Sequence, residues 1–368
     1  MANGFAPYLL KSLITIAGQN YPGFKLTPAG FLAMLLENSN IADLRITNAQ
    51  GHKKEIKVKY KVRNTEATVF DEDNCDIDFV PAYKEANVTN DKIVKTGFHI
   101  SLETVSKYME EASQTQSIGT PSTPVIREIT DTIAHAANSI IMAIDAKLLS
   151  AVTWGTNVTT GNNAAKTLNI GKDNTKYVLD SGFPMLFNDA FQNEFNGQLL
   201  IVGGGLMNAH ELTRMQNAMF AAQNGIDLSK FTGYKFYPDL KSQTYWGANN
   251  IGVFSPGAIH LVDFQKYVSF QSGRLGNSWF AQISLPVNTG NGQTEMTFDL
   301  QVKELDCPTH LFNSYGEESV YDRGYGVYIS KRVGLFQLPS DSYASDDRLA
   351  NVNGALRYNV TNECENCD

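Results

Sequence analysis

Charged residues are scarce in this sequence of 368 residues. Asp, Glu, Lys and Arg make up 18% of the chain, whereas 42% of the residues are hydrophobic and 11% are aromatic. Charged residues usually account for about a quarter of a soluble domain. A chain this apolar can bury a sizeable core, which excludes wholesale disorder. Low charge with many Asn, Gln, Thr and Gly residues also suits a protein that buries polar surface against copies of itself, although secreted β proteins share this composition.

Cysteines are few and form no framework. Cys75 and Cys307 are isolated, and Cys364 and Cys367 form a single C-x-x-C pair. A disulfide-stabilised fold would need more cysteines, and a zinc site would need a second pair of ligands. We therefore expect neither a disulfide scaffold nor a bound metal.

Long apolar runs are missing too. No segment reaches the roughly 20 consecutive apolar residues that cross a bilayer as a helix. No basic region precedes the short apolar run 9–17, so the first residues do not resemble a signal peptide. We expect synthesis in the cytoplasm and no membrane partner, which makes the glycosylation sequons at Asn87, Asn157 and Asn359 chance matches.

The excess of charge is acidic, with a net value of −8. A dedicated DNA- or RNA-binding protein carries a basic footprint, which this chain lacks. An acidic chain can still line a container of nucleic acid, where strong attraction to the wall would be unhelpful.

Motifs for catalysis and cofactor binding are absent as well. The nearest is Gly203-Gly204-Gly205, which follows a predicted strand and precedes a predicted helix, as a phosphate-binding loop would. This loop carries no Lys and fits neither glycine-rich nucleotide motif. A tight turn that glycine allows is the competing interpretation. We expect no enzyme and no cofactor, and retain a nucleotide-binding enzyme as an alternative.

Two further patterns do not complete a metal site. His210-Glu211 could begin a zinc-protease helix, but the position of the second His holds Arg214. The acidic run 71–78 resembles a calcium loop only in charge, because it lacks the central Gly and has Ala82 where the closing Glu should stand.

The first 26 residues have the character of an arm. Their apolar residues, among them Phe5 and Leu9, form a cluster that needs a partner surface, on this chain or on a neighbour. Thr27 and Pro28 then suit the N-cap and first position of a short helix that continues to Leu36.

Strict alternation predicts a long hairpin over 43–80. Apolar residues from Ile56 to Val62 point to one face. The other face carries Lys57, Lys59, Lys61 and Arg63. A turn at 64–66 and a return strand from 67 to 70 lead into an acidic cluster, Asp71, Glu72, Asp73, Asp76 and Asp78. Opposite charges on the two legs can pair within the chain or between subunits, and a solvated hairpin face is the alternative.

The longest predicted helix covers 125–152. Its apolar stripe has helical period: Val125, Ile129, Ile133, Ala136, Ile140, Ile144 and Leu148. At ~1.5 Å per residue it would span ~40 Å, enough to support the whole molecule. A shorter helix is predicted over 102–112.

The rest of the chain alternates between short elements. A polar loop or weak hairpin is predicted over 153–180, and the last 30 residues are expected to be irregular. Helices are predicted over 186–195 and from an N-cap at Asn208 to Gln223. Strands are predicted over 198–202, 233–237, 251–254, 266–271, 279–285, 294–304 and 326–337, with a turn at 256–258.

The order of these elements resembles the major capsid proteins of tailed phages, which have the Hong Kong 97-type fold. The stretches that carry the likeness are the helix end at 144–149 (IDAKLL), the strand, turn and helix at 198–216 (QLLIVGGGLMNAHELTRMQ), the strand at 251–262 (IGVFSPGAIHLV) and the closing strands at 278–305. The resemblance covers roughly 27–335 by order and texture.

The resemblance implies an α+β fold with a long spine helix, an extended β-hairpin loop, and peripheral and axial domains. It implies no catalytic, cofactor or metal site. The expected divisions are an arm and short helix (1–42), the extended loop (43–80), a peripheral domain (81–174), an axial domain (175–265), closing peripheral strands (266–337) and a C-terminal extension (338–368).

The resemblance also implies a function as a shell-forming subunit. Pentamers and hexamers would build an icosahedral shell around double-stranded DNA, which would be touched nonspecifically on the inner face. Portal, scaffold or decoration proteins are possible partners, and the product would be a virion assembled in the host cytoplasm. Non-viral encapsulin-like compartments share this fold and are the main alternative.

Candidate contacts between subunits follow from these observations. They lie in the arm, on the hairpin and at the glycine turn: Phe5, Leu9, Lys57, Lys59, Lys61, Arg63, Asp71, Glu72, Asp73, Gly203, Gly204 and Gly205.

Overall fold

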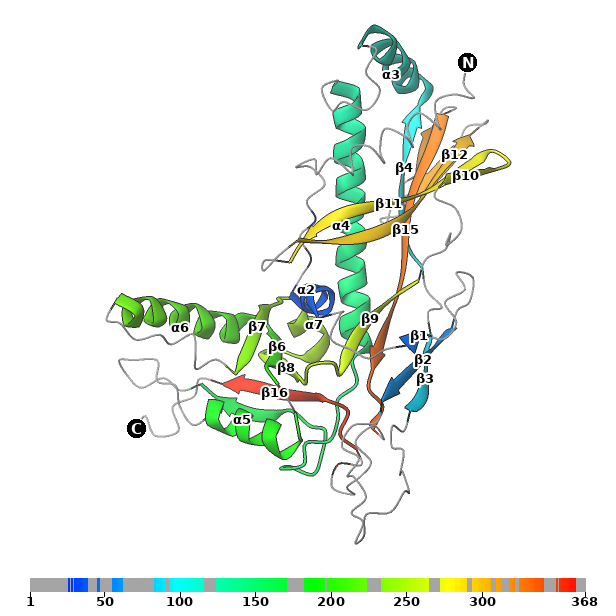
Figure 1. Ribbon diagram of the computed structural model, residues 1–368. Coiled ribbons are helices and arrows are strands. Elements are labelled where there is room, and N and C mark those ends of the chain that lie inside the picture. Colours follow the sequence, from blue (N-terminus) through cyan, green and yellow to red (C-terminus); the bar gives the residue numbers. More distant parts are fainter. Residues whose placement is uncertain are drawn as a thin grey trace, which may run out of the picture.

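The computed structural model has an upright arm built around one long helix and a second body at its foot (Figure 1). The described residues are 26, 28, 30–38, 45–46, 55–61, 83–89, 93–115, 124–170, 182–195, 197–223, 233–264, 272–289, 293–305, 309–312, 318–321, 324–340, 349 and 351–361. Helices and strands both contribute to the core, so the α+β class is confirmed.

Helix α4 (Pro124–Ala151) has 28 residues and is about 42 Å long. The predicted helix over 125–152 is therefore confirmed to within a residue at each end. Its apolar stripe is buried from Ile129 through Ile140 to Leu148, because residues three and four apart share one face of a helix. This face packs against the strands of the upright arm.

The sheet of the upright arm has the strand order β10-β11-β12-β15-β4, with β9 paired to the far half of β15. Its central strands are antiparallel and alternate buried with more exposed residues, as a half-covered sheet requires. The bounds are β4 (Val94–Ser101), β9 (Ile259–Phe264), β10 (Ser272–Leu275), β11 (Ser278–Asn288), β12 (Gln293–Leu305) and β15 (Gly324–Gln337). Three predicted late strands are thereby confirmed, β4, β9 and β10 were not predicted, and 266–271 lies outside the described residues.

The body at the foot contains a second sheet with the order β5-β16-β8-β6-β7. Strand β6 is buried at all five positions, because alternate residues enter two different cores. The bounds are β5 (Lys166–Asn169), β6 (Leu199–Gly203), β7 (Tyr234–Pro238), β8 (Asn250–Phe254) and β16 (Ala355–Thr361).

Strand β16 corrects one prediction. The last 30 residues were expected to be irregular, yet β16 lies between β5 and β8, parallel to β5 and antiparallel to β8. Its side chains Leu356, Tyr358 and Val360 enter the core beneath the sheet. This segment therefore belongs to the body that contains the predicted axial strands 198–202, 233–237 and 251–254.

A third, small sheet has the order β1-β2-β3, with β1 (Arg45–Ile46), β2 (Glu55–Lys61) and β3 (Tyr83–Thr89). The predicted basic strand is β2. Its described partner is β3, where Val58 is opposite Ala86, and the return strand expected at 67–70 lies outside the described residues. The apolar face of β2 packs on β9 and the end of β15 through Val58, Tyr60 and Phe336.

The shorter helices complete the two bodies. They are α2 (Gly30–Glu37), α3 (Leu102–Thr115), α5 (Gly182–Gln192), α6 (Gly205–Gln223) and α7 (Ser242–Trp246), and β13 (Thr309–Phe312) pairs with β14 (Glu318–Tyr321). Helix α6 begins three residues before the predicted cap Asn208. Within α6, the buried Glu211 accepts a hydrogen bond at its Oε1 from the Tyr234 hydroxyl on β7, at 2.5 Å.

Helix α2 lies where the two bodies meet, beside α4, α7 and β7 (Figure 1). It starts at Gly30 and not at Pro28, where the prediction placed it. A Cβ at position 30 would lie 2.2 Å from the carbonyl oxygen of Pro238, so only glycine fits there. Phe31 fills the junction, with its ring 5.6 Å from that of Trp246 and 5.8 Å from that of Phe254.

Candidate functional site

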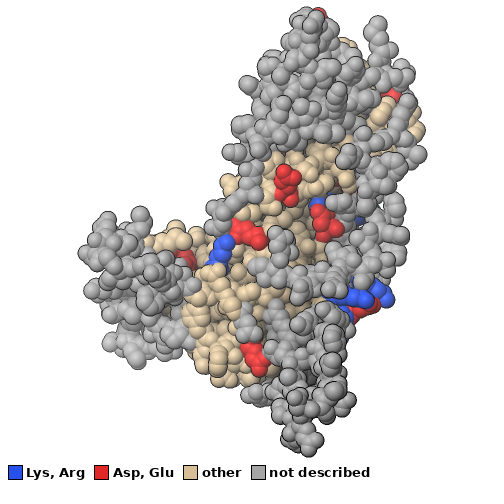
Figure 2. Space-filling view, viewed as in Figure 1, with Lys and Arg blue, Asp and Glu red and all other residues tan. Residues whose placement is uncertain are grey.

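The basic face of the hairpin strand is turned to solvent, as its alternation predicted. Lys57 and Lys59 are exposed on β2, and their Nζ atoms lie 3.8 and 3.5 Å from the carboxylate oxygens of Glu85 on β3. Figure 2 shows this mixture of basic and acidic side chains at the lower right, over the small sheet. An exposed pair of this kind adds little stability, about 0–1 kcal/mol.

The described acidic partner of these lysines is Glu85 on β3. Glu85 was not among the predicted contacts, and the predicted acids Asp71, Glu72 and Asp73 lie outside the described residues, as do Phe5, Leu9 and Arg63. For Lys61 the structure describes the strand but not the side chain. The only signal for this pairing in the sequence is the opposite charge of Glu85, since 83–89 has no strict alternation.

The three glycines at the β6–α6 turn serve close packing. A Cβ on Gly203 would lie 2.5 Å from the Ile251 side chain, and one on Gly204 would lie 2.8 Å from the Asp239 carbonyl oxygen. Gly205 has a φ of 50°, which favours glycine. The turn that precedes α7 thus occupies the space beside these glycines, which supports the tight-turn interpretation over a phosphate site.

Several large apolar side chains on the elements around the second sheet are exposed to solvent. Phe191 on α5 is 78% exposed, Leu240 before α7 is 72% exposed, and Leu212 on α6 is 60% exposed. Met215 lies one turn beyond Leu212, and Tyr245 on α7 is also exposed. Contiguous apolar patches are typical of surfaces that another protein covers, whereas apolar side chains exposed singly are common on any protein. Sequence reasoning missed this set, because only the fold shows which apolar residues stay outside.

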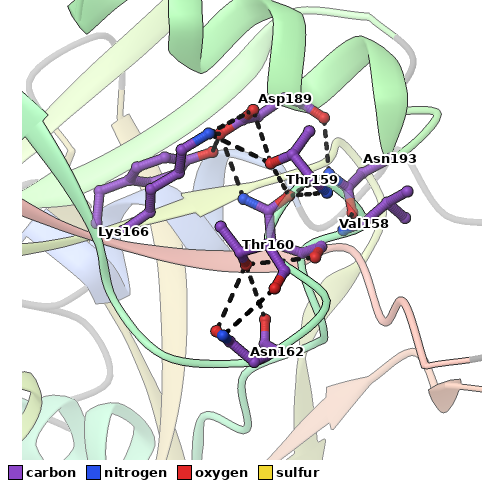
Figure 3. A network of polar contacts seen from close by, with 9 residues as sticks. Val158, Thr159, Thr160, Asn162, Lys166, Asp189 and Asn193 are labelled. Atoms are coloured by element: carbon purple, nitrogen blue, oxygen red, sulfur yellow. Dashed lines mark hydrogen bonds and ion pairs between the residues drawn. The ribbon is translucent and has the colours of Figure 1, made fainter.

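A buried polar network joins the second sheet to α5 (Figure 3). At its centre is Asp189, whose side chain is 1% exposed and whose Oδ2 lies 2.8 Å from the Lys166 Nζ. The same oxygen accepts hydrogen bonds from the Tyr358 hydroxyl at 3.1 Å and from Asn157 Nδ2 at 3.3 Å. A buried carboxylate needs such partners, because an unpaired charge is costly away from water.

The network also fixes the loop that precedes β5. The Asn157 Oδ1 accepts hydrogen bonds from the Thr159 amide at 3.1 Å and from Asn193 Nδ2 at 3.0 Å. Burial, helped by the charge of Asp189, raises the pKa of Tyr358 and keeps its hydroxyl protonated as a donor. The segment 153–180 was expected to be a polar loop or weak hairpin. Its described part, 153–170, is a loop followed by strand β5, and these contacts show how its polar side chains are accommodated in the fold.

Neither a metal centre nor a membrane-spanning helix is found among the described residues. No group of three or more His, Cys, Asp or Glu side chains in that part of the chain is arranged to hold a metal ion. No helix there is long and apolar enough to cross a membrane.

Comparison with known proteins finds similarity in structure alone. No protein-family profile matches the sequence, and no curated protein matches it. The structure is similar to that of the cyanophage A-1(L) capsid asymmetric unit, with a TM-score of 0.43 and 12% identity over 91% of this chain and 93% of the other. The capsid of the cyanophage P-SCSP1u gives 0.38 and 10% identity over 92% and 87%. The capsid of the Myoviridae phage XM1 gives 0.39 and 10% identity over 89% and 92%.

Proposed function

We propose that this chain is the major subunit of an icosahedral capsid with the Hong Kong 97-type fold. The observation that carries the proposal is the arrangement of its parts: one 28-residue helix supports a long sheet, a second sheet lies at its foot, and a charged hairpin lies beside them. This arrangement supports the assignment of a spine, a peripheral domain, an axial domain and an extended loop, as the order of elements led us to expect.

The surface chemistry supports self-assembly. Rings of identical subunits use heterologous contacts, in which one patch of a subunit meets a different patch of the next. The chain offers an apolar set on α5, α6 and α7, and a separate set of charges on β2 and β3. Many modest contacts of this kind sum to a stable shell because they act together.

The proposed capsid function implies binding partners and a place of assembly. Pentamers and hexamers of this chain would form the shell of a virion that is assembled in the host cytoplasm and encloses double-stranded DNA. Contact with that DNA would be nonspecific and on the inner face, and the overall acidic charge of the chain would keep it weak. Portal, scaffold and decoration proteins would bind the assembled shell. We propose no catalytic activity, and the filled space beside Gly204 supports that assignment.

Electron microscopy of the purified full-length protein tests the proposal. We expect rings of five or six subunits, or closed shells, with a yield that depends on salt. A protein that stays monomeric at high concentration under every salt condition would overturn it. Particles purified from the native source would contain DNA if the shell is viral, and enzyme cargo if it is a compartment.

A further inference from the structure

Two buried carboxylates converge on the start of α2. Asp239, from the turn after β7, accepts a hydrogen bond at its Oδ2 from the amide of Phe31 at 2.9 Å. Asp145, from the spine helix α4, accepts one at its Oδ1 from the amide of Leu32 at 3.2 Å. These side chains come from the two bodies of the molecule and meet on neighbouring amides of one short helix.

The two acids differ in how well they are satisfied. Asp239 Oδ1 also accepts from the amides of Lys241 and Ser242, at 2.9 and 3.3 Å. Asp145 is fully buried, and its Oδ2 has no hydrogen-bond partner among the described residues. A neutral carboxyl group tolerates such a position far better than a carboxylate does.

The charges around Asp145 favour a bound proton. Burial, and then the charge of Asp239, raise the pKa of Asp145 to about 7, against the opposing effects of the Leu32 amide and Lys241. Lys241 directs its Nζ to the carbonyl oxygen of Met142, at 2.8 Å. On α4 itself, Lys147 is bonded to the carbonyl oxygen of Val333.

The far end of α2 is held independently. The Glu37 carboxylate accepts hydrogen bonds from Lys235 at 2.5 Å and from the Tyr237 hydroxyl at 2.7 Å, both on β7. Just before α2, Leu26 pairs with the edge of β11, where its amide donates to the carbonyl oxygen of Pro286 at 3.1 Å. Helix α2 is therefore a link between the sheet of the upright arm and the sheet at its foot.

We propose that Asp145 and Asp239 form a proton-controlled latch on this link. With one proton on the pair, both carboxyl groups hold the start of α2 in the junction. When that proton is lost, two negative charges face each other in a buried site and the start of α2 is released, with its far end still tied to β7. This would loosen the junction between the two bodies. The consequence for shell geometry rests on the proposed function, but the latch itself is a property of one subunit.

The sign of the pH effect follows from linkage. The ordinary pKa of an Asp is near 3.8 and that of Asp145 in the fold is about 7, so the folded state retains a proton that the unfolded state releases between these values. Stability therefore falls as pH rises through this window and is constant above it. For one retained proton, the unfolding equilibrium constant rises by up to about tenfold per pH unit.

Unfolding of the full chain by urea from pH 5 to pH 7 tests the latch. The ratio of the unfolding constants of wild type and Asp145→Asn should change by about 50-fold over this range, because the Asn side chain cannot titrate. Asp131→Asn, on the exposed side of α4, is the matched control and should follow the wild type. Equal pH slopes for wild type and Asp145→Asn would overturn the proposal.

A second measurement does not depend on the absolute stability of the variants. Hydrogen exchange, corrected for intrinsic rates, should show protection of the Phe31 and Leu32 amides falling above pH 7 in wild type but not in Asp145→Asn. Asp239→Asn should move the transition to lower pH if that variant folds. Loss of protection at the same pH in all three proteins would also contradict the latch. Both measurements use unassembled subunits, so a failure here leaves the proposed shell function standing, and a failure to assemble leaves the latch standing.

Discussion

Single buried polar residues define the second body more than its sequence suggests. Asp189 contacts Lys166, Asn157 and Tyr358, which come from three separate segments of the chain. None of these residues forms a motif, since the partners are between 23 and 169 positions away from Asp189 in sequence. Their alignment depends on the strand order of the finished sheet, and no local pattern could have revealed it.

Replacing Tyr358 by Phe tests the value of this network. The change removes one hydrogen bond to a buried carboxylate that keeps its other partners, so we expect a loss of about 1–2 kcal/mol in the free energy of unfolding. Urea unfolding at pH 7 would measure it. Tyr245→Phe, on the exposed surface of α7, is the matched control and should have no effect. An equal loss in both variants would show that the network contributes nothing special.

At the scale of elements, the hydrophobic periodicity of the sequence predicted those helices and strands that have one buried and one exposed face. The stripe of α4 and the alternation of β2 each show in sequence because one face is buried and the other is not. The same alternation is present in β16, where Leu356, Tyr358 and Val360 alternate with polar residues. It was overlooked because the last 30 residues are polar as a whole. Strand β3 was not predicted, because it pairs with β2 across a sequence separation of at least 22 positions, from Lys61 to Tyr83.

The spine helix should tolerate substitution on one side only. Ile140 is 1% exposed, and truncation to Ala leaves a cavity, with an expected loss of about 2–5 kcal/mol in unfolding free energy. Met142, two positions further along, is 57% exposed, so Met142→Ala should change stability by less than about 0.5 kcal/mol. Chemical unfolding of the two variants checks this difference, and similar losses would contradict the orientation of α4.

For the whole molecule, the sequence predicted the α+β fold class and the long spine helix, but not that residues 355–361 form a strand of the sheet at the foot. The segment 355–361 crosses from one end of the sequence into a sheet whose other strands begin at residue 166. Pairing between strands so far apart in sequence costs chain entropy, and no local sequence pattern shows which strands will pair. The contacts between subunits remain predictions. We expect them to involve the exposed charges on β2 and the exposed apolar side chains around the second sheet.

Reversing the charges of the hairpin tests that prediction. Lys57→Glu with Lys59→Glu should leave the unfolding midpoint of the subunit almost unchanged, because the exposed ion pairs contribute little. Assembly yield, measured by light scattering and microscopy, should fall, and its dependence on salt should change. Lys107→Glu, in the exposed pair on α3, is the control and should assemble normally. Normal assembly of the double variant would show that Lys57 and Lys59 take no part in the contacts between subunits.

The position of β16 sets an order of events during synthesis. This strand separates β5 from β8, so the sheet at the foot of the molecule cannot close until residue 361 has emerged from the ribosome. Until then, β5 lacks its neighbour and the buried Tyr358 is missing from Asp189. Nascent chains on one messenger RNA therefore cannot present a finished lower body to one another. In the proposed assembly, contacts that use the lower body would therefore form only after β16 has been synthesised.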